Sequence, residues 1–257
     1  MVDQRQGPTN RELNMTDRNL QFVIARSVCD PFPSIRVGAF LASDLERAVD
    51  RLDGPASLAR ARAALQAASL STANLLDDPR IREWRGAVAR CKLKPSAVRS
   101  SAEQLVRRIV GPNQFATGLP LVDTYCAVSA KHVAPIGGYD AEKLPSDVIV
   151  LRLARPATDA FTALGGRAED MPLGESVAVY ASADEVLCYA FNHRDSQKTS
   201  LDAATGRAVF FSEAVHECQW EHAETALCEL RELLGAAGAQ VSPVVWATPS
   251  APSIAIG

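Results

Sequence analysis

A change of periodicity along the chain constrains the fold most. In the first half, composition predicts a helix over residues 57–70, and a second helix follows the boundary at Asp77–Pro79. Residues 100–110 form a third helix, with an apolar stripe at helical spacing. In the second half, Val148–Ala154 and Ala208–Val215 have the short, β-rich pattern of strands. Because helices concentrate early and strands late instead of alternating, we predict an α+β fold. Its core would be a mixed or antiparallel β-sheet flanked by helices.

The ends of the chain differ in composition from its middle. Residues 1–19 are polar and predict a disordered leader. Two early strands, a hairpin turning at Ser182–Asp184 and a last amphipathic helix place one domain at residues 20–236. Residues 237–257 are rich in Pro and Ser, which predicts a tail in which only Val244, Val245 and Trp246 pack back.

Composition limits the cellular setting. The 257 residues include 47% hydrophobic residues, enough for a sizeable core, and carry a net charge of −3. The six cysteines contain no C-x-x-C pair, the start lacks an apolar signal region, and no apolar run is long enough for a bilayer. We therefore expect a cytoplasmic protein with reduced thiols and no membrane partner.

One segment is strongly basic. Residues 80–108 contain nine Lys or Arg and only two Glu. Clustered cations attract a polyanion even on a mildly acidic protein, although a solvated helix face is the alternative. The candidate RNA contacts are Arg85, Arg90, Lys92, Lys94 and Arg99.

The stretch LVDTYCAVSAKHVAPIGGYD predicts a helix followed by a permissive turn. At 100° per residue, Cys126 and Ser129 share one helix face and Tyr125 lies at its edge. Pro135 ends the helix, and Gly137-Gly138 would let a ligand lie close to the main chain. The alternative is an ordinary helix end. Likewise, a Cys126 nucleophile served by His132 or His193 competes with simple packing of a small thiol.

The polar connection FNHRDSQKTSLDAATG, residues 191–206, is too long for a usual hairpin loop. It is either a binding loop or an exposed insertion. His216, Cys218 and His222 have a metal-like spacing but lack a fourth ligand, so no metal is expected. No P-loop, G-x-G-x-x-G or G-x-S-x-G motif occurs, and no cofactor is expected.

Taken together, RSSAEQLVRRI, LPLVDTYCAVSAKHVAPIGGYDAEKL, FNHRDSQKT and AVFFSEA resemble the B3/B4 domain. This domain performs editing in the β subunit of phenylalanyl-tRNA synthetase and also occurs as free-standing small proteins. The resemblance runs from about Leu20 to Leu234. It implies an editing-domain fold and an aminoacyl-tRNA deacylase that works in trans on the acylated 3′ end of tRNA.

The resemblance also implies a set of site residues. The ester site would use His193 as the base, with Ser129, Gly137 and Gly138 beside it. The substrate-binding residues would be Asp123, Tyr125, Cys126, Asp140, Asn192, Arg194, Ser196, Thr199 and Glu213. Glu213 matches the acid that recognises the amino-acid side chain in the synthetase. We expect the segment after Ala134 and the connection from Asn192 to enclose one cavity, sized for the acylated end of an RNA.

This chain departs from the family pattern at two positions. Gly137 stands where the synthetase has a histidine, and Cys126 stands where free-standing relatives usually have asparagine. Losing that amide removes a hydrogen-bonding group and could change substrate choice or abolish hydrolysis. Two other functions therefore stay open: a module that binds tRNA or a nucleotide without turnover, and a transferase that passes the aminoacyl group to a small amine.

Overall fold

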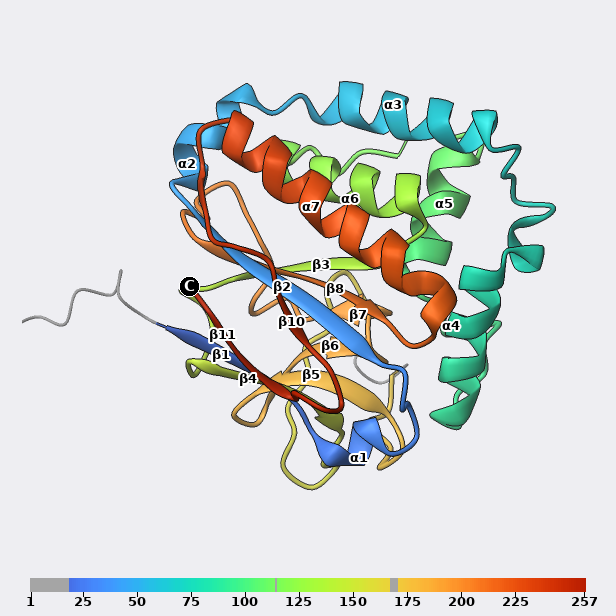
Figure 1. The fold of residues 1–257 in the computed structure, drawn as a ribbon, viewed down its shortest axis with the longest axis vertical. Helices are drawn as coiled ribbons and strands as arrows, with labels where there is room; N and C mark the ends of the chain where they lie inside the picture. Colours follow the sequence, from blue (N-terminus) through green and yellow to red (C-terminus); the bar gives the residue numbers. More distant parts are fainter. Residues whose placement is uncertain (1–18, 114, 167–170) are drawn as a thin grey trace, which may run out of the picture.

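The computed structural model describes residues 19–113, 115–166 and 171–257, and Figure 1 shows that they form layers. A layer of helices covers one face of a five-stranded sheet, and a six-stranded sheet packs against the other face. The predicted α+β class and the mixed, helix-flanked sheet are confirmed. The leader expected before residue 19 lies outside the described residues.

The five-stranded sheet is antiparallel throughout and forms the middle layer. Its strands are β10 (Val245–Ala247), β2 (Arg36–Ser43), β8 (Ala208–Ala214) and β3 (Ile136–Asp140), with β9 (Gln240–Val241) pairing on β2. Side chains alternate between its two faces. On β8, Phe210 packs among the helices, whereas Phe211 packs against the other sheet.

The helical layer buries its apolar stripes on Phe40 and Phe210 of that sheet. Its helices are α3 (Gly54–Ala67), α5 (Ser101–Val110), α6 (Pro120–His132) and α7 (Trp220–Ala236); α4 (Pro79–Arg90) lies beside them, and α1 (Arg26–Cys29) and α2 (Leu45–Ala48) are short. Ser100 caps α5, since its Oγ accepts a hydrogen bond from Glu103 N at 3.2 Å.

The six-stranded sheet is mixed because β1 and β4 are parallel. In spatial order its strands are β11 (Ser253–Ile256), β1 (Leu20–Ile24), β4 (Val148–Leu153), β5 (Ala178–Ser182), β6 (Glu185–Tyr189) and β7 (Arg194–Asp195). Aromatic rings fill the space between the sheets: the Phe22 and Phe211 centroids are 5.1 Å apart, and those of Tyr180 and Phe211 are 5.5 Å apart.

Three segments differ from their expected form. The C-terminal segment is not a loose tail: it supplies β9, β10 and β11 and completes both sheets. Gly137 and Gly138 lie inside β3 rather than in a turn, and neither has a positive φ. The long connection from Phe191 leaves β6 in one sheet and reaches β8 in the other, so its length serves a crossing between layers.

Among the described residues, no helix combines the length and apolar character that crossing a bilayer requires.

Candidate functional site

A small cavity lies between the two sheets, next to the first turn of α5. Its volume is about 20 Å³, which is room for about one water molecule. Strands of both sheets contribute to its walls, together with the start of α5. It is lined by Ser101, Ile136, Gly137, Tyr139, Tyr180, Cys188, Phe191, Asn192, Asp195, Phe211 and Glu213.

Glu213 is the most deeply buried acid in the wall, with 2% of its surface exposed. It faces the cavity because Phe211, two residues earlier on β8, also points between the sheets. Tyr180 Oη donates to Glu213 Oε2 at 3.1 Å, and Asn192 Nδ2 donates to Oε1 at 2.6 Å. Burial raises the pKa of Glu213 to about 7 despite these two hydrogen bonds, which oppose the shift. A carboxyl group with this pKa exchanges protons near neutral pH.

Asn192 joins this carboxyl group to the start of α5. Ser101 N donates to Asn192 Oδ1 at 2.9 Å, which fixes the side-chain amide and aims its Nδ2 at Glu213. Ser101 also borders the cavity, and its buried Oγ has no hydrogen-bond partner among the residues that the structure describes. A polar atom without a partner here is available to a ligand.

Asp195 is the second acid in the wall. It comes from the short strand β7 and is partly accessible. Burial of its carboxyl group raises the pKa of Asp195, while the Cys188 thiol and the Arg194 guanidinium lower it. The sequence analysis did not single out Asp195 from the other polar residues of its loop. A strand at Arg194–Asp195 would have assigned one of these two side chains to the sheet's inner face, but that strand was not predicted.

Gly137 and Gly138, which were predicted to act together, lie on opposite faces of β3. Gly137 borders the cavity, where an added Cβ would lie 3.6 Å from Tyr139 Oη. Gly138 faces the helices, where an added Cβ would lie 2.9 Å from the Phe210 ring. The structure thus brings Gly137 and Asn192, but not Gly138, to one cavity, and its volume of about 20 Å³ is much smaller than the acylated RNA end that it was expected to hold.

The side chains predicted from α6 stay in the helical layer. Ser129 Oγ donates to Ala134 O at 2.6 Å and closes the end of its helix. Tyr125 packs edge to face on Phe210, with ring centroids 6.0 Å apart. Burial raises the pKa of the Cys126 thiol, which keeps it protonated and opposes a role as nucleophile. None of the three borders the cavity.

Two predicted acids hold turns together. Asp123 Oδ1 accepts from Thr117 N at 2.7 Å and Thr117 Oγ1 at 2.8 Å. Asp140 Oδ2 accepts from Thr205 Oγ1 at 2.8 Å, and its Oδ1 accepts from Glu142 N. Both therefore shape the scaffold, and neither of these predicted substrate-binding residues borders the cavity.

Within the polar connection, Phe191, Asn192 and Asp195 line the cavity. His193 Nδ1 lies 2.8 Å from Arg99 O and 3.1 Å from Arg99 N, and burial lowers the pKa of His193. Arg194 donates to Leu164 O at 3.3 Å, and Ser196 Oγ accepts from Lys198 N. Thr199 is buried under β3 with its carbonyl bonded to Asp140 N. The base predicted at His193 is thus turned to α5, beside the cavity wall.

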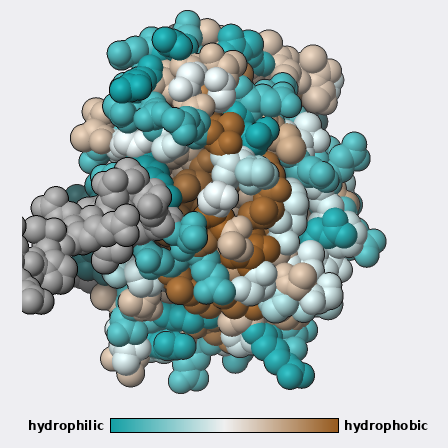
Figure 2. Space-filling model, turned by 60° about the vertical axis from the view of Figure 1, so that its left-hand side comes forward, coloured by the Kyte–Doolittle hydropathy of each residue, from teal (hydrophilic) through white to brown (hydrophobic). Residues whose placement is uncertain are grey.

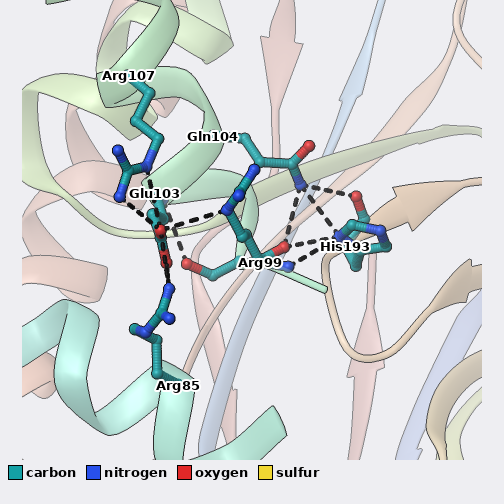
Figure 3. A network of polar contacts seen from close by, with 7 residues as sticks. Arg85, Arg99, Glu103, Gln104, Arg107 and His193 are labelled. Atoms are coloured by element: carbon teal, nitrogen blue, oxygen red, sulfur yellow. Dashed lines mark hydrogen bonds and ion pairs between the residues drawn. The ribbon is translucent and has the colours of Figure 1, made fainter. Parts of the chain in front are cut away.

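The basic segment forms an arginine cluster around a buried acid (Figure 3). Glu103 is fully buried and pairs with Arg85 at 3.1 Å, Arg107 at 3.1 Å and Arg99 at 3.6 Å. One carboxylate neutralises one of three guanidinium groups, so the cluster keeps an excess of positive charge. Gln104 Nε2 donates to Arg99 O and His193 O, which fastens the cluster to the cavity loop.

The other predicted RNA contacts lie at the surface. Arg90 covers the Phe32 ring at 4.8 Å, and Lys92 and Lys94 are exposed. These side chains are free to meet an anionic surface beside the cluster.

The metal-like triplet has other partners. His216 Nδ1 accepts from Cys218 N at 3.3 Å, and His222 Nδ1 lies 3.3 Å from Arg80 Nη1. In the described part of the chain, no three His, Cys, Asp or Glu side chains are grouped as metal ligands.

A larger groove of about 490 Å³ lies between α2 and the start of α6. It belongs to the side of the molecule that Figure 2 turns forward, where apolar side chains gather. Its walls include Leu45, Leu119 and Leu201, and its acids, Asp50 and Asp202, are exposed. The groove thus lacks the buried, hydrogen-bonded acid that marks the cavity between the sheets as the candidate reaction site.

Comparison with known proteins gives one family match. The family model described as B3/4 domain matches residues 83–228, a range that includes every residue in the cavity wall. A solved N-terminal fragment of the phenylalanyl-tRNA synthetase beta-subunit from Pyrococcus horikoshii is 14% identical, with a TM-score of 0.38. That match covers 48% of this chain and 41% of the fragment. The search of curated proteins finds no match.

Proposed function

The chain belongs to the B3/4 domain family, and from this we propose that it hydrolyses the ester of an aminoacyl-tRNA in trans. The reaction centre is the cavity between the sheets. One observation carries the proposal: the buried Glu213 carboxyl group, whose pKa is raised to about 7, borders a space with room for about one water molecule. A general base works best when its pKa lies near the working pH.

The proposed chemistry needs only water and the ester. The Glu213 carboxylate accepts a proton from the water molecule. At the same time the water oxygen attacks the ester carbonyl carbon, and the C=O electron pair moves onto the carbonyl oxygen. Ser101 Oγ, buried and without a protein partner in the described chain, donates to that oxygen. When the intermediate collapses, the bond to the ribose oxygen breaks, and Glu213 returns the proton to the leaving hydroxyl. The products are a free amino acid and uncharged tRNA.

The arginine cluster supplies cations that can bind the phosphates of the RNA. Arg99 precedes Ser101 by two residues, so the positive charge around Glu103 adjoins the cavity. Exposed Lys92 and Lys94 extend it along the surface. Phosphates of the tRNA end would contact these cations while the acylated ribose reaches the cavity.

The proposal is tested with a panel of correctly charged and mischarged tRNAs and a measurement of ester loss. We expect at least one member to be hydrolysed to free amino acid. Glu213→Gln keeps the shape but removes the base, so it should lower that rate about 10²- to 10⁴-fold. The wild-type rate should rise with pH through about 7, as Glu213 ionises. Hydrolysis of no panel member above the spontaneous rate contradicts the proposal, and a new amide product points to transfer instead.

A second variant tests the cavity without touching an ionisable group. Gly137→Ala places a methyl group in the water-sized space at an ordinary contact distance, so the fold should persist while hydrolysis falls. Gly86→Ala is the matched control, because nothing lies within 4 Å of its added Cβ. Equal rates for both variants would place the reaction elsewhere.

A further inference from the structure

We propose that Asp195 binds the α-ammonium group of the aminoacyl ester, which makes the protein selective for substrates with an unblocked amino group. This inference rests on the proposed function and adds a residue that determines specificity. It begins with two carboxyl groups that share one water-sized cavity.

The cavity wall is acidic and contains no cation. Besides Asp195 from β7 and Glu213 from β8, its ionisable groups are Tyr139 from β3, Tyr180 from β5 and Cys188 from β6. None of the described residues that line it is a Lys, Arg or His. A ligand that complements this wall carries positive charge or hydrogen-bond donors.

The two acids differ in what they already bind. Both oxygens of Glu213 accept hydrogen bonds, from Tyr180 and Asn192. The groups that favour the charged form of Asp195 are the weak thiol donor of Cys188 and Arg194, and Arg194 donates to Leu164 O. Asp195 is therefore the carboxyl group with capacity for a ligand.

The geometry of an aminoacyl ester fits this division. Its nitrogen is separated from the ester carbonyl carbon by one N–Cα and one Cα–C bond, so the two atoms are about 2.5 Å apart. Holding the ammonium group at Asp195 therefore keeps the carbonyl carbon beside the cavity, within reach of the water next to Glu213. One acid positions the substrate and the other activates water.

An N-acylated ester lacks what Asp195 needs. Its amide nitrogen is neutral and has one N–H, and its acyl group adds bulk at a cavity with room for about one water molecule. Binding it leaves the Asp195 carboxylate desolvated without a counter-charge, which is costly. Sites built around such a polar contact reject analogues lacking it strongly, so we expect discrimination of about 100-fold or more.

The experiment uses the panel member that is hydrolysed fastest and its N-acetylated derivative. Wild type should favour the free amine about 100-fold or more in kcat/KM. Asp195→Asn should raise KM for the free amine. It should also raise the rate on the N-acetyl ester, because no carboxylate is then left without a counter-charge, so the preference falls at least about tenfold. Asp184→Asn, on the exposed turn between β5 and β6, is the control and should keep the preference. An unchanged preference in Asp195→Asn overturns the inference.

A binding measurement on the wild-type protein separates this inference from hydrolysis. The probes are a 3′-aminoacylamino-3′-deoxyadenosine, whose amide resists hydrolysis, and its N-acetyl form, compared by calorimetry. We expect tighter binding of the free amine, weakening above pH about 8 as its amino group loses its proton. If this holds while no tRNA is hydrolysed, the inference stands and the proposed function fails. Equal affinity for both probes, or affinity for neither, overturns the inference even if hydrolysis is observed.

Discussion

At the scale of single residues, the direction of one side chain decides the chemistry. Glu213 follows Phe211 at the spacing of two that puts both between the sheets; a shift by one residue would have pointed it into the helical layer beside Phe210. The resemblance to the B3/B4 domain named Glu213 but could not fix this register. Helical spacing correctly placed Cys126 and Ser129 on one face of α6. It could not predict that this face packs within the helical layer and not at the cavity between the sheets.

The buried Glu213 should also make stability depend on pH. Its pKa is raised from 4.5 to about 7, so the folded protein holds this proton more tightly than the unfolded chain does. The stabilisation is complete below pH 4.5 and is lost as pH rises through 7. Between pH 4.5 and 8, wild type should therefore lose up to about 3 kcal/mol relative to Glu213→Gln. Urea denaturation at both pH values measures this, and parallel pH profiles would argue against it.

At the scale of elements, α5 links the basic surface to the cavity. Its first turn meets Asn192 through Ser101, and Glu103 on its buried face gathers three arginines (Figure 3). The sequence predicted the helix and the density of positive charge. It did not predict that Glu103 would be the common partner, because the pairing with Arg85 joins two helices whose packing no local pattern encodes.

Removing that common partner should alter RNA binding. Glu103→Gln leaves Arg85, Arg99 and Arg107 without their counter-charge, so we expect lower stability, tighter tRNA binding and a steeper fall of affinity with salt. Because these guanidinium groups are partly exposed and can rehydrate, the stability loss should be about 1–3 kcal/mol. The measurement is log Kd against log salt concentration.

Glu83→Gln is the control for this experiment, since it removes the same charge from the same basic segment but not from the cluster. A salt dependence that changes equally in both variants would mean that the cluster does not contact the RNA.

At the scale of the whole molecule, the last strands were the part that sequence reasoning could not place. β9, β10 and β11 are short, and their partners β2 and β1 lie about 200 residues earlier in the chain. Pairing at such separation leaves no periodic signal in a segment of two to four residues. The same limit explains why two sheets were not foreseen: local patterns identified β6 and β8 as strands but not as members of different sheets.

The contribution of β11 to stability can be measured at Ile256. Its side chain is fully buried between the sheets, so Ile256→Ala should cost about 2–5 kcal/mol in the free energy of unfolding. Ile254→Ala, at a partly exposed position on the same strand, should cost less than half as much. Equal losses in urea denaturation would show that β11 packs less tightly than its burial implies.

The pairing of Leu20 with Ile256 has a consequence for how this unit can be used. The described chain enters and leaves the sheet on two neighbouring strands, so both connections emerge at one place on the surface (Figure 1). A domain whose two ends lie close together can be inserted into a surface loop of a larger polypeptide without separating the two sides of that loop. The position of the two strands is thus compatible with use as an inserted domain.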